Sequence, residues 1–149
     1  MSRAWKTLSL SLIVVFSSLA VAACSDDPPL CPAEEEEDEG ADVGPSTGAT
    51  CNGSTLDYDG FGKPFMEKYC TSCHSSTVKG EEARHCAPDD HNFDTLDEIV
   101  FTAKHMDQVA AAGPAATNDE MPPNGNPKPT AQERLDLGTW LACEVERMP

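Results

Sequence analysis

The chain has 149 residues and is strongly acidic, with 26 Asp and Glu against 10 Lys and Arg and a formal net charge of −16. A surface of this sign repels the phosphates of nucleic acids and anionic lipid headgroups, which excludes charge-driven binding to either. Partners that dock through charge are therefore expected to present basic surfaces.

The first 23 residues have the order of a secretory signal. Arg3 and Lys6 form a basic head, an apolar run follows over residues 8–19, and small residues precede Cys24. The apolar run is shorter than the roughly 20 residues that span a bilayer, so export is favoured over a retained transmembrane helix. The chain is expected to reach the bacterial cell envelope.

The end of this signal, Val21-Ala22-Ala23-Cys24, resembles the lipobox of bacterial lipoproteins. The resemblance implies that residues 1–23 are removed and that Cys24 carries acyl chains. Several acyl chains would hold the protein stably at a membrane surface, facing the periplasm or on the outer membrane. The alternative is an ordinary signal peptidase site that happens to precede a Cys.

Residues 24–50 are predicted to form a lipidated, unfolded tether. Six consecutive acidic residues occupy positions 34–39, and a stretch with Gly, Pro, Ser and Thr follows them. Charge repulsion and low hydrophobicity keep such a segment extended and solvated. The alternative is that the acidic run forms a specific docking site for a partner. One small domain, residues 51–149, remains. A core of this size usually needs disulfides or a cofactor.

A helix is predicted from about Lys63 to Cys73, and its end carries the motif Cys70-Thr71-Ser72-Cys73-His74. C-x-x-C-H is the attachment signature of c-type haem. Two thiols on one helical turn can add to the vinyl groups of haem, and the adjacent imidazole can bind the iron. The motif therefore predicts one covalent haem c, with His74 as the proximal iron ligand.

Two other kinds of site contain part of this motif. A thioredoxin-like redox pair has no need of the following His. A zinc site could use Cys70, Cys73 and Cys86 with a His such as His85, but zinc ribbons usually show a second C-x-x-C, which this chain lacks. Both are weaker interpretations than haem attachment in an exported protein.

Residues 61–146 resemble the class I c-type cytochromes, an all-α family whose helices wrap one covalent haem. In that family a Gly stands eight residues before the first haem Cys, as Gly62 does here, and permits close crossing of the first and last helices. The family usually has an aromatic residue at the position of Met66, and Phe65 or Phe61 is expected to fill that space. The resemblance implies an all-α, haem-wrapping fold.

Met121 is predicted to be the distal iron ligand. It lies 47 residues after His74 and is followed by two prolines, which fix the backbone of an irregular loop. A Met in such a loop before the last helix resembles the distal-ligand loop of class I cytochromes, and a thioether ligand implies a high-potential carrier. Met106 is the strongest rival. Any of His85, His91 and His105 would give a bis-histidine haem, and His105 is favoured among them because it lies in the same predicted helix as Met106.

The resemblance also implies a partner for the second ring nitrogen of His74. Family members often use a Pro carbonyl a little downstream of the motif, and Pro88 is the candidate in this chain.

Two further helices are predicted, each opened by a capping-box pattern of Thr followed three residues later by Glu. Helical spacing of apolar residues then extends each of them. The patterns are Thr95 with Glu98, before a helix to about Ala112, and Thr130 with Glu133, before a helix to about Glu146. In the last helix Trp140 is expected in the core, and Gly138 is expected to allow close approach to the first helix.

Seven Cys is an odd count that needs an explanation in an exported protein. Lipidation of Cys24 and attachment of haem to Cys70 and Cys73 leave four, enough for two disulfides. Sequence alone permits three connectivities. Because the terminal helices of the cytochrome family lie against each other, the resemblance favours Cys51–Cys143, which leaves Cys31–Cys86.

Together these features predict a one-electron transfer protein of the cell envelope and no enzymatic turnover. Its partners are expected to be redox proteins of the envelope with basic docking surfaces. An open sixth site would instead permit peroxidase-like or ligand-binding chemistry. A lipoprotein module stabilised by zinc or disulfides, with no redox role, is the third possibility.

Overall fold

The computed structural model describes Cys31 and residues 44–148. These residues form helices and no strand, apart from one isolated β-bridge between Ala112 and Thr117. The all-α class predicted from the sequence is confirmed for this part of the chain. The elements are the π-helix η1 (Tyr58–Gly62), α1 (Lys63–Tyr69), α2 (Glu81–Arg84), α3 (Leu96–Phe101), α4 (Ala103–Ala110) and α5 (Ala131–Arg147).

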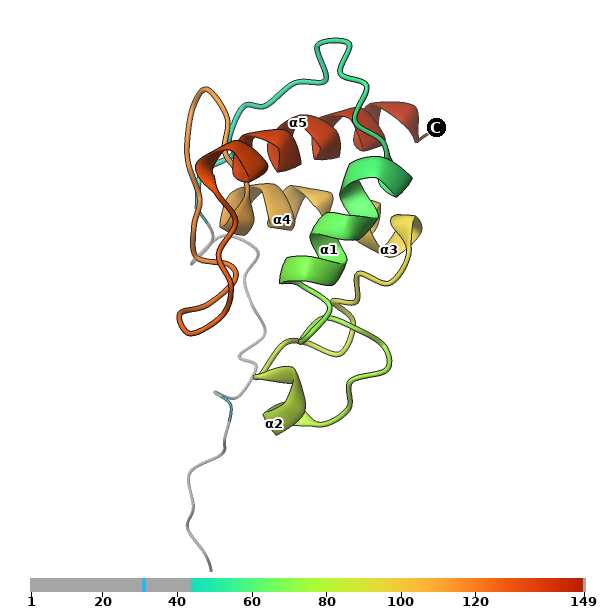
Figure 1. Cartoon of the computed structure of the whole chain (residues 1–149), viewed down its shortest axis with the longest axis vertical. Helices are drawn as coiled ribbons and strands as arrows, with labels where there is room; N and C mark the ends of the chain where they lie inside the picture. The colour runs from blue at the N-terminus through green and yellow to red at the C-terminus, as the bar shows by residue number, and fades with distance from the viewer. Residues whose placement is uncertain (1–30, 32–43, 149) are drawn as a thin grey trace, which may run out of the picture.

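The long helix α5 lies across one end of the molecule, with α1 and α4 packed beside it, and α2 lies at the opposite end (Figure 1). The buried core is made by apolar side chains of α1, α3, α4 and α5. No helix among the described residues has the length and apolar character needed to cross a bilayer.

Both predicted capping boxes are present. The Thr95 hydroxyl accepts from the Glu98 backbone N–H, the Glu98 carboxylate accepts from the Thr95 N–H, and Thr130 and Glu133 repeat this arrangement. These reciprocal bonds satisfy N–H groups that a helix start would otherwise leave without a partner. They explain why α3 and α5 begin where the sequence predicts.

The predicted single helix from Leu96 to Ala112 is wrong, because it is interrupted at Thr102. The Thr102 hydroxyl donates to the carbonyls of Glu98 and Ile99, both at 3.2 Å, and its backbone (φ −102°, ψ 8°) departs from helical geometry. A hydroxyl that bonds back to the preceding turn competes with helix propagation. The chain therefore forms two short helices, α3 and α4.

Helices α1 and α5 cross where Gly62 faces Trp140. A Cβ built on Gly62 would lie 2.6–2.7 Å from two Trp140 ring carbons and closer still to Cζ2. Trp140 is fully buried, and its ring centroid lies 6.0 Å from that of Phe61, which in turn lies 5.6 Å from that of Phe65. The predicted close crossing at Gly62, the core position of Trp140 and the packing of both Phe residues are thus confirmed.

Gly138 has a different neighbour from the one expected. A Cβ there would overlap the carbonyl oxygen of Ala112 and come within 3.1 Å of the Cβ of Ala49. The small residue therefore lets these two segments approach α5. The expectation that it faces α1 is wrong.

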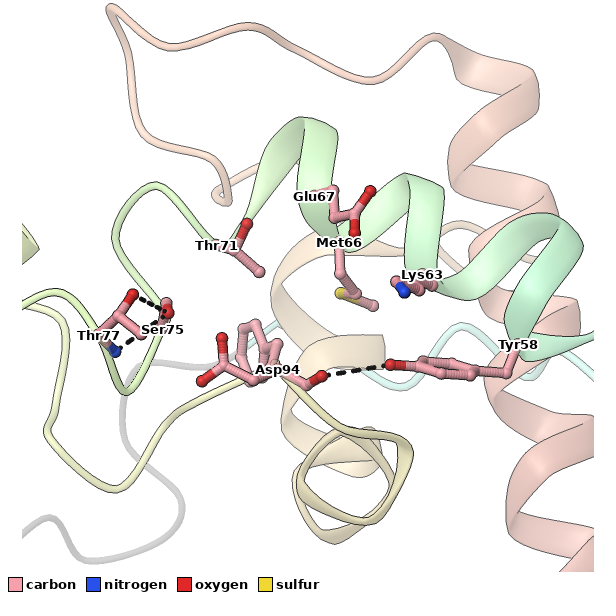
Figure 2. Close-up of a pocket in the computed structure, with 9 residues that line it drawn as sticks. Tyr58, Lys63, Met66, Glu67, Thr71, Ser75, Thr77 and Asp94 are labelled. Atoms are coloured by element: carbon pink, nitrogen blue, oxygen red, sulfur yellow. Dashed lines mark hydrogen bonds between the residues drawn. The ribbon is translucent and has the colours of Figure 1, made fainter.

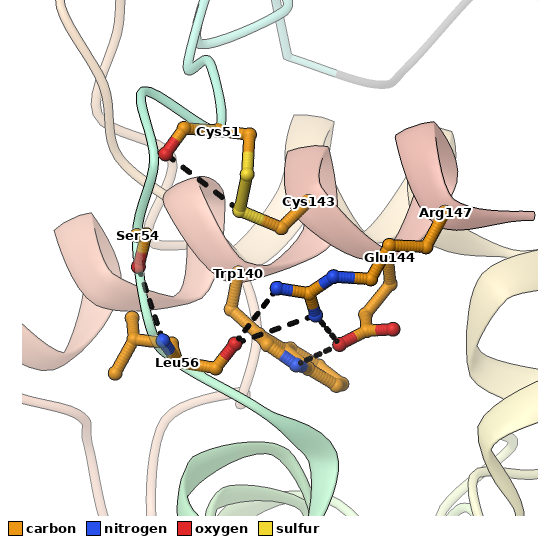
Figure 3. Close-up of a disulfide and its surroundings, with 7 residues drawn as sticks. All are labelled: Cys51, Ser54, Leu56, Trp140, Cys143, Glu144 and Arg147. Carbon is orange, nitrogen blue, oxygen red and sulfur yellow. Dashed lines mark hydrogen bonds and ion pairs between the residues drawn. A yellow bond between two sulfur atoms is a disulfide. The ribbon is translucent and has the colours of Figure 1, made fainter.

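Two disulfides join distant parts of the chain, and they are the pairs that the cytochrome resemblance favours. Cys51 is bonded to Cys143 of α5, and Cys31 is bonded to Cys86 just after α2. Near the first bond, the indole N–H of Trp140 donates to Glu144 at 3.0 Å, and Arg147 pairs with the same carboxylate (Figure 3). The Cys51–Cys143 bond thus ties the segment before η1 to α5.

The last part of the predicted tether belongs to the folded domain. Thr47 is fully buried, its backbone N–H and hydroxyl both donate to the Asp107 carboxylate, and its carbonyl accepts from Ala115 at 2.9 Å. The Pro45 carbonyl accepts from the side chain of Asn118 at 2.9 Å. Ser and Thr give a segment polar groups that can bind a folded surface, which composition alone does not distinguish from a solvated linker.

Candidate functional site

The C-x-x-C-H motif forms one helical turn of its own. Helix α1 ends at Tyr69, earlier than predicted, and the Cys70 carbonyl then accepts from the backbone N–H groups of Cys73 (3.1 Å) and His74 (2.9 Å). Both thiols and the imidazole therefore project from a single turn. This is the local geometry that attachment of haem through two thiols and one axial His requires.

Cys70 and Cys73 are thiols, whereas the other four described cysteines are in disulfides. Burial raises the pKa of the Cys70 thiol to about 12, and the neighbouring Cys73 acts in the same direction. Redox-active C-x-x-C pairs depend on a lowered thiol pKa. The protonated Cys70 therefore does not match a thioredoxin-like pair.

The imidazole of His74 is held on two sides. Its Nδ1 donates to the carbonyl of His91 at 3.0 Å, and its ring stacks on Phe93 with centroids 4.7 Å apart. Burial lowers the pKa of His74, so the ring is neutral at neutral pH, the form that binds metals. With Nδ1 engaged, Nε2 is the nitrogen left for an iron ion.

The carbonyl that binds His74 is not the predicted one. The Pro88 carbonyl accepts from the Arg84 guanidinium instead, and His91, three residues later, takes the expected role. The loop between these residues turns back toward the motif, and its path decides which carbonyl faces the imidazole.

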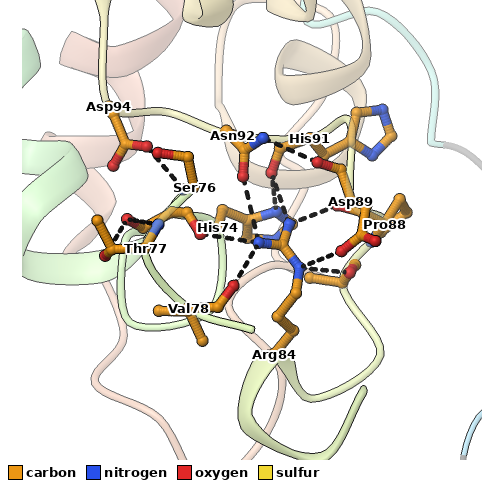
Figure 4. A network of polar contacts seen from close by, with 12 residues as sticks. His74, Ser76, Thr77, Val78, Arg84, Pro88, Asp89, His91, Asn92 and Asp94 are labelled. Atoms are coloured by element: carbon orange, nitrogen blue, oxygen red, sulfur yellow. Dashed lines mark hydrogen bonds and ion pairs between the residues drawn. The ribbon is translucent and has the colours of Figure 1, made fainter. Parts of the chain in front are cut away.

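That loop is organised around Arg84, a buried residue that sequence reasoning missed. Arg84 is only 2% exposed, and its guanidinium donates to carbonyls before and after α2 (Figure 4). A charged side chain in a polar segment ordinarily lies at the surface, so the sequence around Arg84 gives no signal that it is buried.

Met121 is fixed at both of its backbone groups. Its N–H donates to the Val109 carbonyl at 2.9 Å, and its carbonyl accepts from Arg134 at 3.0 Å. The side chain packs against the same buried cluster that Cys70 and Phe93 contact. The structure thus brings Met121 and the motif to one core.

Arg134 is the second buried Arg that the sequence did not single out. It is 4% exposed, and one of its terminal nitrogens, Nη1, donates to the carbonyls of Ala110, Asn118 and Met121. It joins the first turn of α5 to the end of α4 and to the Met121 loop. This residue therefore fixes the loop of the predicted distal ligand.

The rival distal ligands occupy other positions. Met106 is 3% exposed and lies inside the core on α4. The rings of His91 and His105 stack with centroids 5.3 Å apart, and the His91 carbonyl binds the ring nitrogen of His74 that faces away from an iron on Nε2. His91 and His105 therefore lie on the Nδ1 side of His74, away from the ring nitrogen that would bind the iron.

A pocket of about 290 Å³ opens beside the motif turn (Figure 2). Its lining includes Met66, Thr71, Phe93 and Asp94. The Asp94 carboxylate accepts from the Ser76 backbone N–H at 2.7 Å, which lowers its pKa. This carboxylate therefore stabilises the loop after the motif.

A second pocket, of about 600 Å³, lies at the Met121 loop. Asp119 and Glu120 line it before Met121, and Pro123 and Asn124 line it after. The loop is braced by Lys128, whose ammonium group donates to the Pro122 carbonyl. Solvent can thus reach the surroundings of Met121 from this side.

The donor set fits a covalently bound haem. Two thiols on one turn, a neutral imidazole with its Nδ1 engaged, and a thioether on a braced loop are the groups that such a cofactor uses. A zinc site with Cys86 does not fit, because that sulfur is bonded to Cys31. Within the described residues no three His, Cys, Asp or Glu side chains are placed to hold a metal ion.

The predicted lipidation site, Cys24, and the signal before it lie outside the described residues. Comparison of the chain with protein-family models, with curated proteins and with solved structures finds no match.

Proposed function

We propose that the chain is an exported, lipid-anchored carrier of single electrons with one covalent haem c. Cys70 and Cys73 would hold the haem through thioether bonds, with His74 and Met121 as the axial ligands of its iron. The bound haem would supply reversible one-electron chemistry, and the protein would set its orientation and surroundings.

One observation carries this proposal. Of the six described cysteines, the two in C-x-x-C-H remain thiols on one turn with His74, while the other four are consumed by disulfides. A purely structural role for Cys70 and Cys73 would leave two partly exposed thiols without a purpose in an oxidising compartment. Haem attachment uses both sulfurs and the adjacent imidazole.

The protein's part in the chemistry is to hold its ligands in place. The His91 carbonyl orients the His74 ring, and Phe93 packs against one face of it. The backbone of Met121 is held at both ends by Val109 and Arg134. Ligands held in this way would move little between the two oxidation states, which would reduce the rearrangement that accompanies electron transfer.

The cell-envelope location rests on the signal and on Cys24. The Cys31–Cys86 disulfide would leave only six residues between the lipidated Cys24 and the fixed Cys31, a span of seven Cα-to-Cα steps that reaches at most about 25 Å. The acidic run at 34–39 then lies after that fixed point. Its role would be to present charge to basic redox partners rather than to lift the domain off the membrane.

Visible spectra of the oxidised and dithionite-reduced protein, made with haem-attachment machinery, test the proposal. Sharp reduced bands that survive acid–acetone extraction are expected, together with a weak sulfur-to-iron charge-transfer band in the ferric form. The Met121→Ala variant should lose that band and bind carbon monoxide. A colourless protein would overturn the proposal in favour of a disulfide-stabilised module. Carbon monoxide binding by the unmodified ferrous protein would favour a peroxidase-like or ligand-binding role.

A further inference from the structure

Arg84 is enclosed by oxygen atoms of the backbone. Its guanidinium donates to the carbonyls of Ser75 at 2.8 Å and Ala87 at 3.0 Å, to Pro88, and more weakly to His91 at 3.4 Å. A guanidinium group has five N–H donors and no acceptor, so carbonyl oxygens are suitable partners for it. Arg84 thus joins Ser75, just after the motif, to residues 87–91, which return toward the motif.

The His91 carbonyl is shared between two donors. It accepts from Nδ1 of His74 at 3.0 Å and from Nη2 of Arg84 at 3.4 Å. The side chain of Asn92 is also bound to Arg84, at 3.2 Å. The position and the electron density of the carbonyl that orients His74 therefore depend on Arg84.

We propose that Arg84 is a positioning residue for the axial ligand His74, and that its charge raises the reduction potential of the iron bound there. The inference rests on the proposed function, because it concerns how this chain tunes a haem on His74. It assigns a role to a residue outside the haem motif.

Two physical effects act in the same direction. A carbonyl that already accepts from a cation draws less strongly on the Nδ1 proton of His74, so the imidazole donates less electron density to ferric iron. A buried positive charge nearby also favours the ferrous state, which carries one positive charge fewer.

Solvent does not cancel this charge. Asp89 forms an ion pair with Arg84 at 3.4 Å, but its side chain is 95% exposed, whereas that of Arg84 is 2% exposed. Exposed charges are screened by water and salt, and buried ones much less. Of these two charges, Arg84 is therefore the less screened at His74.

Potentiometric titration of the haem-loaded full chain tests the proposal in three variants. Arg84→Met removes the charge and the hydrogen bonds. Arg84→Lys keeps the charge but lacks the planar set of guanidinium donors. Lys79→Met is the matched control, because it removes one positive charge from an exposed position in the same loop. At a fixed potential, Arg84→Met should raise the ferric-to-ferrous ratio by about three- to tenfold, the scale of one ordinary hydrogen bond. Arg84→Lys should raise it less, and Lys79→Met should leave it near wild type.

A second measurement follows the His74 ring by NMR in the ferrous state. Its Nδ1 proton should exchange with solvent faster in Arg84→Met and Arg84→Lys than in Lys79→Met. Equal potentials in the Arg84→Met and Lys79→Met variants would overturn the inference. If Arg84→Met yields no folded protein, the Lys variant decides, since unchanged potential and exchange would contradict positioning. A colourless wild-type protein would refute the proposed function instead.

Discussion

Gly62 is the position where a single methyl group should disturb the domain most. In Gly62→Ala the new Cβ would lie 2.6 and 2.7 Å from Cη2 and Cε2 of Trp140, and closer to Cζ2, where carbon atoms prefer about 3.5–4.0 Å. The indole cannot move aside easily. It is fully buried, and its N–H is bonded to Glu144 at 3.0 Å. Either α1 or α5 must therefore shift.

Overpacking of this kind costs about 1–3 kcal/mol, and the overlap of about 1 Å with several ring atoms places Gly62→Ala near the upper end. Ala in a helical position recovers about 0.5–1 kcal/mol of backbone entropy relative to Gly. The expected net loss is about 2–2.5 kcal/mol. For a domain of this size the midpoint of thermal unfolding should fall by about 10 °C.

Urea unfolding, followed by the fluorescence or circular dichroism of the full chain, measures this loss. Gly60→Ala is the matched control, because it lies on the same π-helix, is exposed, and has only the Asp57 side chain near its new Cβ, at 3.0 Å. The control should change the free energy of unfolding by less than about 1 kcal/mol. If Gly62→Ala falls within 0.5 kcal/mol of that control, roughly the scatter of neutral surface changes, the argument from close crossing is refuted.

Three further predictions concern the site and its surroundings. Arg134→Leu frees the carbonyl of Met121, so the ferrous haem-loaded variant should bind carbon monoxide more readily than wild type in visible spectra; equal binding would mean that the loop is held in another way. Hydrogen bonds from the helix cap, with help from a nearby Lys, lower the pKa of Glu133 from 4.5 to about 2. Its carboxylate therefore stabilises the fold above about pH 4.5 and loses this effect as pH falls toward 2. As the pH is lowered, the urea midpoint of Glu133→Gln should fall less steeply than that of wild type, and identical slopes would contradict this role of Glu133. Replacing Cys31 and Cys86 together by Ser should let the lipid-anchored domain stand farther from a supported bilayer in neutron reflectometry; an unchanged distance would exclude the short anchor.

The features that the sequence predicts well are those that depend on neighbouring residues. The capping boxes at Thr95 and Thr130 are complete within one helical turn, and the motif turn from Cys70 to His74 closes on its own backbone. The Gly62 crossing and the disulfide pairs depended on the family resemblance, because they join parts of the chain far apart in sequence. Local chemistry alone left three disulfide connectivities open.

The features that the sequence misses depend on which distant backbone groups meet. Arg84 and Arg134 are buried because carbonyls of other segments surround them, and neither has a sequence neighbour that indicates this. Thr47 lies in a segment with the composition of a linker, and its burial depends on a bond to the distant Asp107 of α4. Thr102 interrupts a helix whose apolar spacing continues through it, since its hydroxyl competes with the next backbone bond.

The two buried Arg residues have similar structural roles. Arg84 fixes the carbonyl that orients His74, and Arg134 fixes the loop that carries Met121. Each predicted axial ligand thus depends on one cation that is bonded to backbone oxygens. A protein of net charge −16 retains both of them inside the fold.

Peptide mass spectrometry tests the central claim most directly. Trypsin should release residues 69–79, which contain Cys70, Cys73 and His74 and none of the four disulfide cysteines. From protein made with haem-attachment machinery, this peptide is predicted to carry the mass of one haem and to absorb visible light. The same peptide with two alkylatable thiols and no added mass would contradict the assignment of this chain as a carrier of covalent haem.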